Sequence, residues 1–165
     1  MADTAFKGNP IHTSGELPAV GSAAPDFQLV GQDLSTASLA TYEGKKKILN
    51  VFPSLDTPVC ATTVRTFNQK AAAKDGVVVL NISADLPFAS KRFCAAEGIE
   101  VAVTLSSFRG SFARDYGTEL TDGPLVGLNA RAVLVLNEQN QVVHHELVSD
   151  IVQEPDYEAA LSALA

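Results

Sequence analysis

The sequence predicts an α/β fold in which helices pack on a mixed central sheet, preceded by an N-terminal β-hairpin. Short apolar runs rich in β-branched residues alternate with helical segments, and these helical segments have Pro near their starts and Gly near their ends. The chain has 165 residues, a usual length for one domain. We therefore expect residues 1–165 to form a single domain.

Turn-forming residues dominate the N-terminal segment and separate several short strands. Residues 4–7 and 11–13 are expected to pair as a hairpin. Weaker strand patterns follow at 27–30 and 36–39. A cluster of three lysines at 45–47 then reads as a solvated turn before the next strand.

The clearest local pattern is an apolar strand followed by a helix start. Residues 48–52 are apolar or strand-forming, as in a buried strand. Thr57 has the position of a helix N-cap, and Pro58 has the first helical position, where its missing N–H costs nothing. A helix is expected from residue 58 to about residue 74, before the stop signal at Gly76.

The same strand–helix order continues and closes with a hairpin. A buried strand is expected at 77–82, and a helix is expected to open at 85–87 and to end at Gly98. The remaining expected elements are a strand at 101–105, a helical turn at 111–116, a strand pair at 132–136 and 141–146, and a final helix at 155–161. This order indicates a thioredoxin-like α/β fold.

Composition argues against several classes of function. The formal net charge of −7 is poorly suited to binding nucleic acid or an anionic membrane surface. No apolar run reaches the roughly 18 residues of a membrane span. The N-terminus also lacks the basic and apolar regions of a signal peptide. We therefore expect a cytoplasmic protein that binds neither nucleic acid nor membrane.

The chain has two cysteines, Cys60 and Cys94. In a reducing compartment such a pair is more often redox-active than structural. Cys60 would be the third residue of its helix, where free N–H groups and the helix dipole favour thiolate over thiol. The alternative is that each cysteine is a small buried hydrophobe within its helix.

Pro53, Thr57 and Cys60 form the pattern P-x-x-x-T-x-x-C. This pattern resembles the active-site loop of the peroxiredoxins, and residues 52–68 are similar to one subfamily, the bacterial thiol peroxidases of the atypical 2-Cys type. The likeness covers nearly the whole chain. It includes residues 81–89, 91–94, 106–109 and 130–133.

The resemblance implies a role for each matching residue. Cys60 would be the peroxidatic nucleophile, Thr57 would hydrogen-bond the peroxide, and Pro53 would shield the thiolate. Arg131 would complete the site, and Cys94 would be the resolving cysteine. The implied enzyme is a homodimer that reduces hydrogen peroxide and organic hydroperoxides. Its Cys60 sulfenic acid becomes an intramolecular disulfide, which thioredoxin reduces.

Two further expectations concern geometry near Cys60. A disulfide needs Cα atoms within about 7 Å. Because the two cysteines lie on separate expected helices, we expect one or both helix ends to unwind during the cycle. The apolar residues Phe52, Leu55 and Val59 suggest room beside the site for organic peroxides.

Several alternatives stay open at this point. Arg65 or Arg109 could supply the cation instead of Arg131, which by position alone reads as a surface ion pair. A thioredoxin-like disulfide exchange protein without peroxidase activity is the main rival, although Thr57 stands where its first cysteine would be. A metal-binding module would use cysteines and histidines, but their spacing fits no common metal site. No phosphate-binding glycine loop is present, and the sequence predicts no metal and no cofactor.

Overall fold

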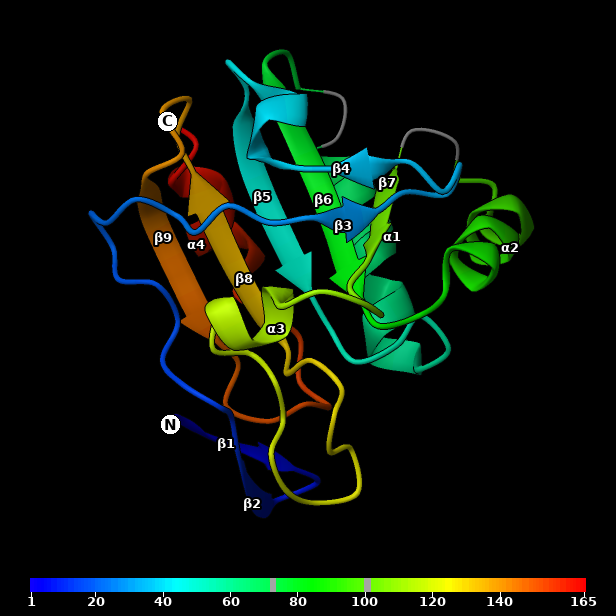
Figure 1. Cartoon of the computed structure of the whole chain (residues 1–165), viewed down its shortest axis with the longest axis vertical. Coiled ribbons are helices and arrows are strands. Elements are labelled where there is room, and N and C mark those ends of the chain that lie inside the picture. Colours follow the sequence, from blue (N-terminus) through cyan, green and yellow to red (C-terminus); the bar gives the residue numbers. More distant parts are fainter. Residues whose placement is uncertain (72–73, 100–101) are drawn as a thin grey trace.

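The centre of the molecule is a mixed, seven-stranded sheet (Figure 1). The structure is a computed structural model that describes residues 1–71, 74–99 and 102–165. Across the sheet the strands are β4 (Thr36–Ala37), β3 (Leu29–Val30), β7 (Val103–Ser106), β6 (Val77–Ser83), β5 (Lys46–Val51), β8 (Ala132–Leu136) and β9 (Val142–Leu147). The three central strands β7, β6 and β5 are parallel, and the outer strands pair antiparallel.

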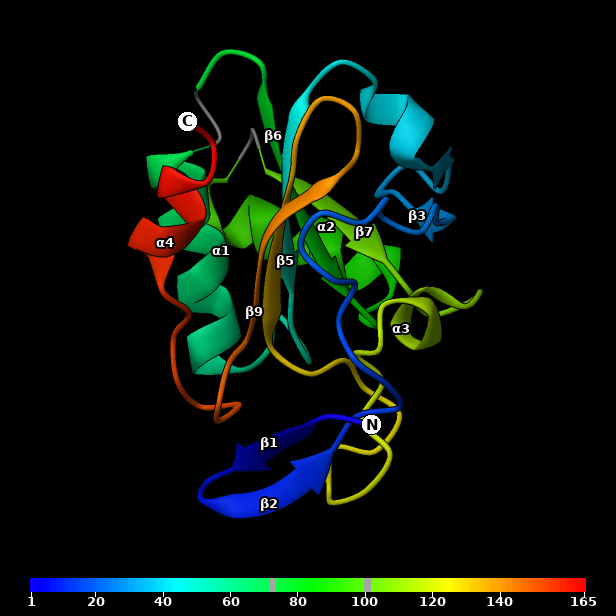
Figure 2. The ribbon, with the colours of Figure 1, turned by 90° about the vertical axis from the view of Figure 1, so that its left-hand side faces the viewer.

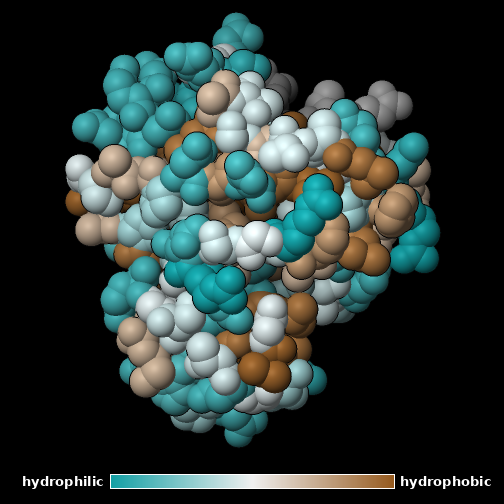
Figure 3. Space-filling view, in the orientation of Figure 1, coloured by the Kyte–Doolittle hydropathy of each residue, from teal (hydrophilic) through white to brown (hydrophobic). Residues whose placement is uncertain are grey.

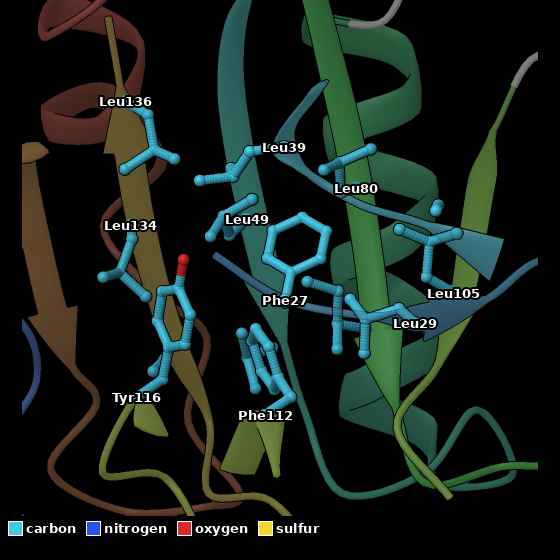
Figure 4. Packing of buried hydrophobic residues seen from close by; sticks show 14 of the residues in the cluster. Phe27, Leu29, Leu39, Leu49, Leu80, Leu105, Phe112, Tyr116, Leu134 and Leu136 are labelled. Atoms are coloured by element: carbon cyan, nitrogen blue, oxygen red, sulfur yellow. The ribbon is translucent and has the colours of Figure 1, made fainter. Parts of the chain in front are cut away.

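Among the described residues, two helices cover one face of this sheet, and aromatic and leucine side chains pack on the other face. Helices α1 (Pro58–Lys70) and α4 (Tyr157–Ser162) lie on the same side (Figure 2). They pack through Phe67 and Ala160 on strand residues such as Ile48. On the opposite face, Phe27 and Phe112 pack with leucines of the sheet (Figure 4). This layering puts the first turn of α1 beside the carboxyl end of β5.

Shorter helices complete the layers. The 3-10 helix η1 (Leu39–Tyr42) and α3 (Phe112–Asp115) lie on the aromatic side. Helix α2 (Pro87–Glu97) lies at the side of the molecule near β7 (Figure 1). Among the described residues, no helix is long and apolar enough to cross a lipid bilayer.

A separate two-stranded sheet lies at one end of the molecule (Figure 1). It consists of β1 (Asp3–Phe6) and β2 (Asn9–His12), which pair antiparallel. Lys7 and Gly8 between them both have positive φ, 53° and 81°, as a two-residue hairpin turn requires. The Thr4 hydroxyl donates to the Val148 carbonyl at 2.8 Å, which ties the hairpin to the segment after β9.

The predicted mixed sheet with flanking helices and an N-terminal hairpin is present. The prediction of a helix to residue 74 is wrong, because α1 ends at Lys70 and Ala71 leaves helical geometry as its C-cap. The chain must turn there, since β6 begins at Val77 to pair with Lys46. Residues 72–73 of that expected helix, and residue 101 of the expected strand 101–105, lie outside the described residues.

Two weak strands are also shorter than predicted. Of residues 27–30, the strand β3 includes Leu29–Val30, and Phe27 instead packs against Phe112. The expected strand at 36–39 ends at Ala37, because Leu39 begins η1 after Ser38. The backbone N–H of Ser38 donates to the Thr41 hydroxyl, which favours this short helix over a longer strand.

Candidate active site

Cys60 lies in the first turn of α1, where the sequence predicts it. Thr57 is the N-cap with extended backbone angles, and Pro58 is the first helical residue. The loop before the helix is held by Asp85, whose carboxylate accepts from the Ser54 hydroxyl at 2.8 Å and from the Leu55 N–H at 2.7 Å. The end of β6 therefore positions the loop that presents the cysteine.

Arg131 contacts the thiol directly. Its Nη2 lies 3.1 Å from Cys60 Sγ, and its Nε donates to the Ile151 carbonyl at 2.8 Å. Both Cys60 and Arg131 are almost fully buried, at 0% and 1% exposure. Within the described residues, Arg131 makes no ion pair with a carboxylate, and its Nη1 is buried without a hydrogen-bond partner.

This arrangement puts the sulfur beside a buried guanidinium that lacks a carboxylate partner among the described residues. An isolated buried cation is costly unless a group of opposite charge or a hydrogen-bond acceptor lies beside it. A Cys60 thiolate would supply the missing negative charge 3.1 Å from the guanidinium. The unpaired Nη1 then remains as a donor for a second anionic or polar group.

A small cavity of about 120 Å³ opens at Arg131. Pro53 and Thr57 line it, so the structure brings three of the predicted site residues to one space. Thr57 is exposed, and its hydroxyl donates to the Ser54 carbonyl at 2.9 Å instead of capping the helix. The rest of the lining is largely apolar, from Phe6, Val59, Leu125, Leu128, Ile151 and Val152.

Most of the apolar residues that line the cavity differ from the three that the sequence suggested. Of the three residues proposed to make room for organic peroxides, Val59 lines the cavity. Phe52 and Leu55 pack with Cys60 in a buried cluster and are not among the lining residues. Phe6 and Ile151 line the cavity from the two ends of the chain, and no local sequence pattern points to such distant contacts.

Asp150 joins the N-terminal hairpin to this site. Its carboxylate accepts from the backbone N–H groups of Lys7, Gly8 and Val152 at 3.1, 2.8 and 3.1 Å. Burial raises the pKa of Asp150, but these N–H donations lower it, and the net pKa lies below the ordinary value. We call this set of three hydrogen bonds the Asp150 clamp. Because Ile151 follows Asp150 directly and its carbonyl accepts from Arg131 Nε, the clamp also positions the arginine.

Replacing Asp150 with Ala should therefore weaken catalysis without touching the cysteine. We expect stability to fall by about 1–3 kcal/mol, since three backbone donors lose their acceptor. The reaction of Cys60 with peroxide, which the sequence resemblance implies, should slow by up to about 100-fold, the cost of a catalytic group misplaced by about 1 Å. Stopped-flow fluorescence and thermal melting would measure both effects.

Asp156→Ala is the matched control for that variant. Asp156 caps α4 by accepting from the Ala159 N–H at 3.0 Å, and its loss should cost about 1 kcal/mol. It should leave the peroxide reaction unchanged. Equal loss of activity in both variants, or a wild-type rate in Asp150→Ala, would contradict the positioning role of Asp150.

Cys94 is held in a different environment, in the last turn of α2. The Gln32 amide Nε2 donates to Cys94 Sγ at 3.5 Å and to the Thr104 hydroxyl at 2.6 Å. Burial raises the pKa of the Cys94 thiol, and the contacts with Gln32 and Thr104 offset part of that rise. Gln32 and Thr104 are not predicted from the sequence, because each is a single polar residue in an ordinary strand or turn.

The two cysteines form no disulfide with each other in the structure, and both are buried free thiols. Thr104 belongs to β7, whereas Arg131 directly precedes β8, and β6 and β5 lie between these strands. Phe93, the neighbour of Cys94, packs against the buried cluster that contains Cys60, so α1 and α2 are in contact. The expectation that a helix end unwinds during disulfide formation stays a prediction.

The alternative cations lie elsewhere. Arg65 pairs with Glu97 at 3.1 Å, and Arg109 stacks on the Phe108 ring at 5.3 Å from its centroid. His12, at the end of β2, contacts Asp122 in the segment before β8. In the part of the chain that the structure describes, no group of three or more candidate metal ligands is assembled.

Known proteins match this chain in sequence and in fold over most or nearly all of its length. The Redoxin family model matches residues 19–161. The thiol peroxidases of Mycobacterium bovis and Mycobacterium tuberculosis are each 56% identical to it over 164 residues, covering 99% of both chains. The chain therefore belongs to the redoxin family, and within it to the peroxiredoxin-type thiol peroxidases.

Solved structures agree with this assignment. A peroxiredoxin-like protein from Aquifex aeolicus superposes with a TM-score of 0.92 at 35% identity, covering 99% of this chain and 96% of that one. A thiol peroxidase from Chromobacterium violaceum has a TM-score of 0.88 at 21% identity over 98% and 95% of the chains, which supports the fold alone. The predicted fold class and family resemblance are thus confirmed, whereas the roles of single residues stay predictions.

Proposed function

We propose that this thiol peroxidase reduces hydrogen peroxide and organic hydroperoxides with Cys60 as nucleophile, and that Cys94 and thioredoxin complete the cycle. The observation that carries the proposal is the contact of 3.1 Å between Arg131 Nη2 and Cys60 Sγ. This contact pairs a buried cation with the sulfur beside an apolar cavity.

In the first step, the Cys60 thiolate attacks the terminal oxygen of the hydroperoxide. The O–O bond breaks, the sulfur loses two electrons and becomes a sulfenic acid, and the leaving oxygen takes up a proton to give water or an alcohol. Arg131 Nη1 and the N–H groups of the first helical turn are donors for the charge that develops on that oxygen. The Thr57 hydroxyl would turn from Ser54 to hold the peroxide.

The cavity supports organic hydroperoxides as substrates. Apolar side chains from the hairpin, the loop before β8 and the segment after β9 surround a space of about 120 Å³ beside Arg131. An alkyl group could lie against them while the peroxide oxygens face the guanidinium. Pro53 closes the same space on the side of the active-site loop and would exclude water from the thiolate.

In the second step, Cys94 attacks the Cys60 sulfenic acid as a thiolate. A Cys60–Cys94 disulfide forms, the S–O bond breaks, and the departing hydroxide becomes water on protonation. The first turn of α1, the last turn of α2, or both would unwind for this step, because Cys60 is held in α1 against Arg131 and Cys94 is held in α2 against Gln32. The dithiol of thioredoxin then returns two electrons and two protons to the disulfide.

We propose a homodimer as the working form. Leu86 and Phe88 at the start of α2 are exposed, and so is Phe108, two residues after the end of β7. Brown, hydrophobic residues gather where α2 lies in the space-filling view (Figure 3). Exposed apolar patches of this kind mark protein contacts. We also propose that the enzyme works in the cytoplasm, where thioredoxin keeps thiols reduced.

A coupled assay tests the proposed function. Wild-type protein with cumene hydroperoxide, thioredoxin, thioredoxin reductase and NADPH should oxidise NADPH rapidly, and Cys60→Ser should not. Hydrogen peroxide in place of cumene hydroperoxide tests the other substrate class. NADPH oxidation in neither protein, with either peroxide, would contradict a thioredoxin-dependent peroxidase.

A further inference from the structure

A row of polar side chains crosses the buried face of the sheet beneath α1. Asn50 on β5 pairs in register with Asn81 on β6, and Asn81 pairs with Thr104 on β7. Paired residues on neighbouring strands point to the same face. All three are at most 4% exposed, and the residues two positions earlier on β5 and β6, Ile48 and Val79, are apolar residues of the same face.

Hydrogen bonds connect this row to the backbone of Cys60. The Asn50 amide Nδ2 donates to Asn81 Oδ1 at 2.9 Å and to the Thr63 hydroxyl of α1 at 3.3 Å. The Thr63 hydroxyl in turn donates to the Cys60 carbonyl at 2.8 Å. The first turn of α1 is thus tied to the middle of the sheet through a side chain one turn further along the helix.

The other end of the row reaches the environment of Cys94. Asn81 Nδ2 donates to the Val103 carbonyl of β7 at 3.1 Å. The next residue, Thr104, accepts from Gln32, which also contacts Cys94 Sγ. A single buried polar row therefore connects the backbone of Cys60 with the surroundings of the Cys94 thiol.

Stability alone does not account for this row. Within the described residues, Asn50 Oδ1 is buried without a hydrogen-bond partner, which carries a desolvation cost. An apolar residue at position 50 would avoid that cost and would match Ile48 and Val79 on the same face. A buried group that is left unsatisfied in this way requires an explanation other than packing.

We propose that Thr63, anchored by Asn50, is a positioning residue that holds Cys60 against Arg131 and opposes the unwinding needed for disulfide formation. The proposal rests on the proposed peroxidase cycle and deepens it. When the first turn of α1 unwinds, the Cys60 carbonyl must leave the Thr63 hydroxyl. The bond therefore lowers the population of the open form, from which Cys94 attacks the sulfenic acid and water leaves.

Thr63→Val tests this role, because it removes the hydroxyl and keeps the shape of the side chain. Disulfide formation after a pulse of hydrogen peroxide should become about two- to tenfold faster, the equilibrium shift expected for one lost hydrogen bond. The fraction of Cys60 overoxidised to sulfinic acid at excess peroxide should fall in parallel, because the sulfenic acid is removed sooner. Rapid-quench alkylation followed by mass analysis would measure both quantities.

Two further variants separate positioning from a general structural role. Thr63→Ser keeps the hydroxyl and should return disulfide formation to the wild-type rate. Thr62→Val is the matched control, because the Thr62 hydroxyl also donates to a carbonyl one turn back, that of Pro58, but at the exposed side of α1. It should leave the rate nearly unchanged, because water replaces this exposed hydrogen bond when the turn unwinds, whereas the bond of Thr63 is buried. If Thr63→Val does not fold, Thr63→Ala removes the same hydroxyl without introducing a second methyl group.

The results of this experiment separate a failure of the positioning role from a failure of the proposed peroxidase cycle. Faster disulfide formation in Thr63→Val, restored by Thr63→Ser, supports the positioning role. An unchanged or slower rate in a folded Thr63→Val or Thr63→Ala variant overturns it while the peroxidase cycle stands. Absence of a peroxide-induced disulfide in the wild-type protein would instead overturn the proposed cycle itself.

Discussion

Replacing Arg131 with Met should slow the reaction of Cys60 with peroxide by about 10²–10³-fold, the usual cost of one donor to developing negative charge. The guanidinium lies 3.1 Å from the sulfur and leaves Nη1 free beside the cavity. Its loss removes both the cation beside the sulfur and the proposed donor for the leaving oxygen. Stopped-flow measurement of sulfenic acid formation in a Cys94→Ser background would isolate this step.

The fold should survive this substitution. Methionine fills much of the apolar space of the arginine stem, and the change leaves the Ile151 carbonyl without its donor, at a cost of about 1–3 kcal/mol. Circular dichroism melting would measure that cost. Arg65→Met is the matched control, because Arg65 pairs with Glu97 near the surface and should be dispensable for the chemistry. Near-wild-type rates in a folded Arg131→Met variant would refute the role of Arg131.

Replacing Cys94 with Ser should allow each chain to react with peroxide once but should prevent turnover. The variant should consume one equivalent of peroxide per chain and then stop in the thioredoxin assay, because the Cys60 sulfenic acid has no second thiol in the chain. Its first step should keep the wild-type rate, since the contacts of Cys94 are with Gln32 and not with Arg131. Quantifying peroxide consumed per chain checks the prediction.

Cys60→Ser provides the opposite control for that experiment. It should consume no peroxide even though Cys94 is present, because burial raises the pKa of the Cys94 thiol and keeps it mainly protonated at neutral pH. Sustained turnover by Cys94→Ser would show that Cys94 is not the resolving residue.

The parts of the site that follow from local sequence are those near Cys60. Thr57 and Pro58 mark the helix start by their own conformational preferences, and the structure has the helix start there. The position of Arg131 next to Cys60 came from the family resemblance, since an arginine at a strand end carries no local signal of its own. The structure adds the contact and the absence of an ion pair within the described residues.

Long-range contacts account for what the sequence did not predict. Asp150 meets Lys7 and Gly8, which are more than one hundred positions away, and this clamp positions the segment bonded to Arg131. Gln32 reaches Cys94 from the turn between β3 and β4. Such pairs depend on how the sheet brings distant segments together, and a single polar residue in a turn does not reveal its partner.

Intact-mass analysis after one equivalent of peroxide, without reductant, tests the central claim most directly. The wild-type chain should lose about 2 Da, the mass of the two hydrogens given up when Cys60 and Cys94 form a disulfide. Cys94→Ser should instead gain about 16 Da as the sulfenic acid. An unchanged mass in the wild-type chain would contradict the account and would return Cys60 to the status of a buried core residue.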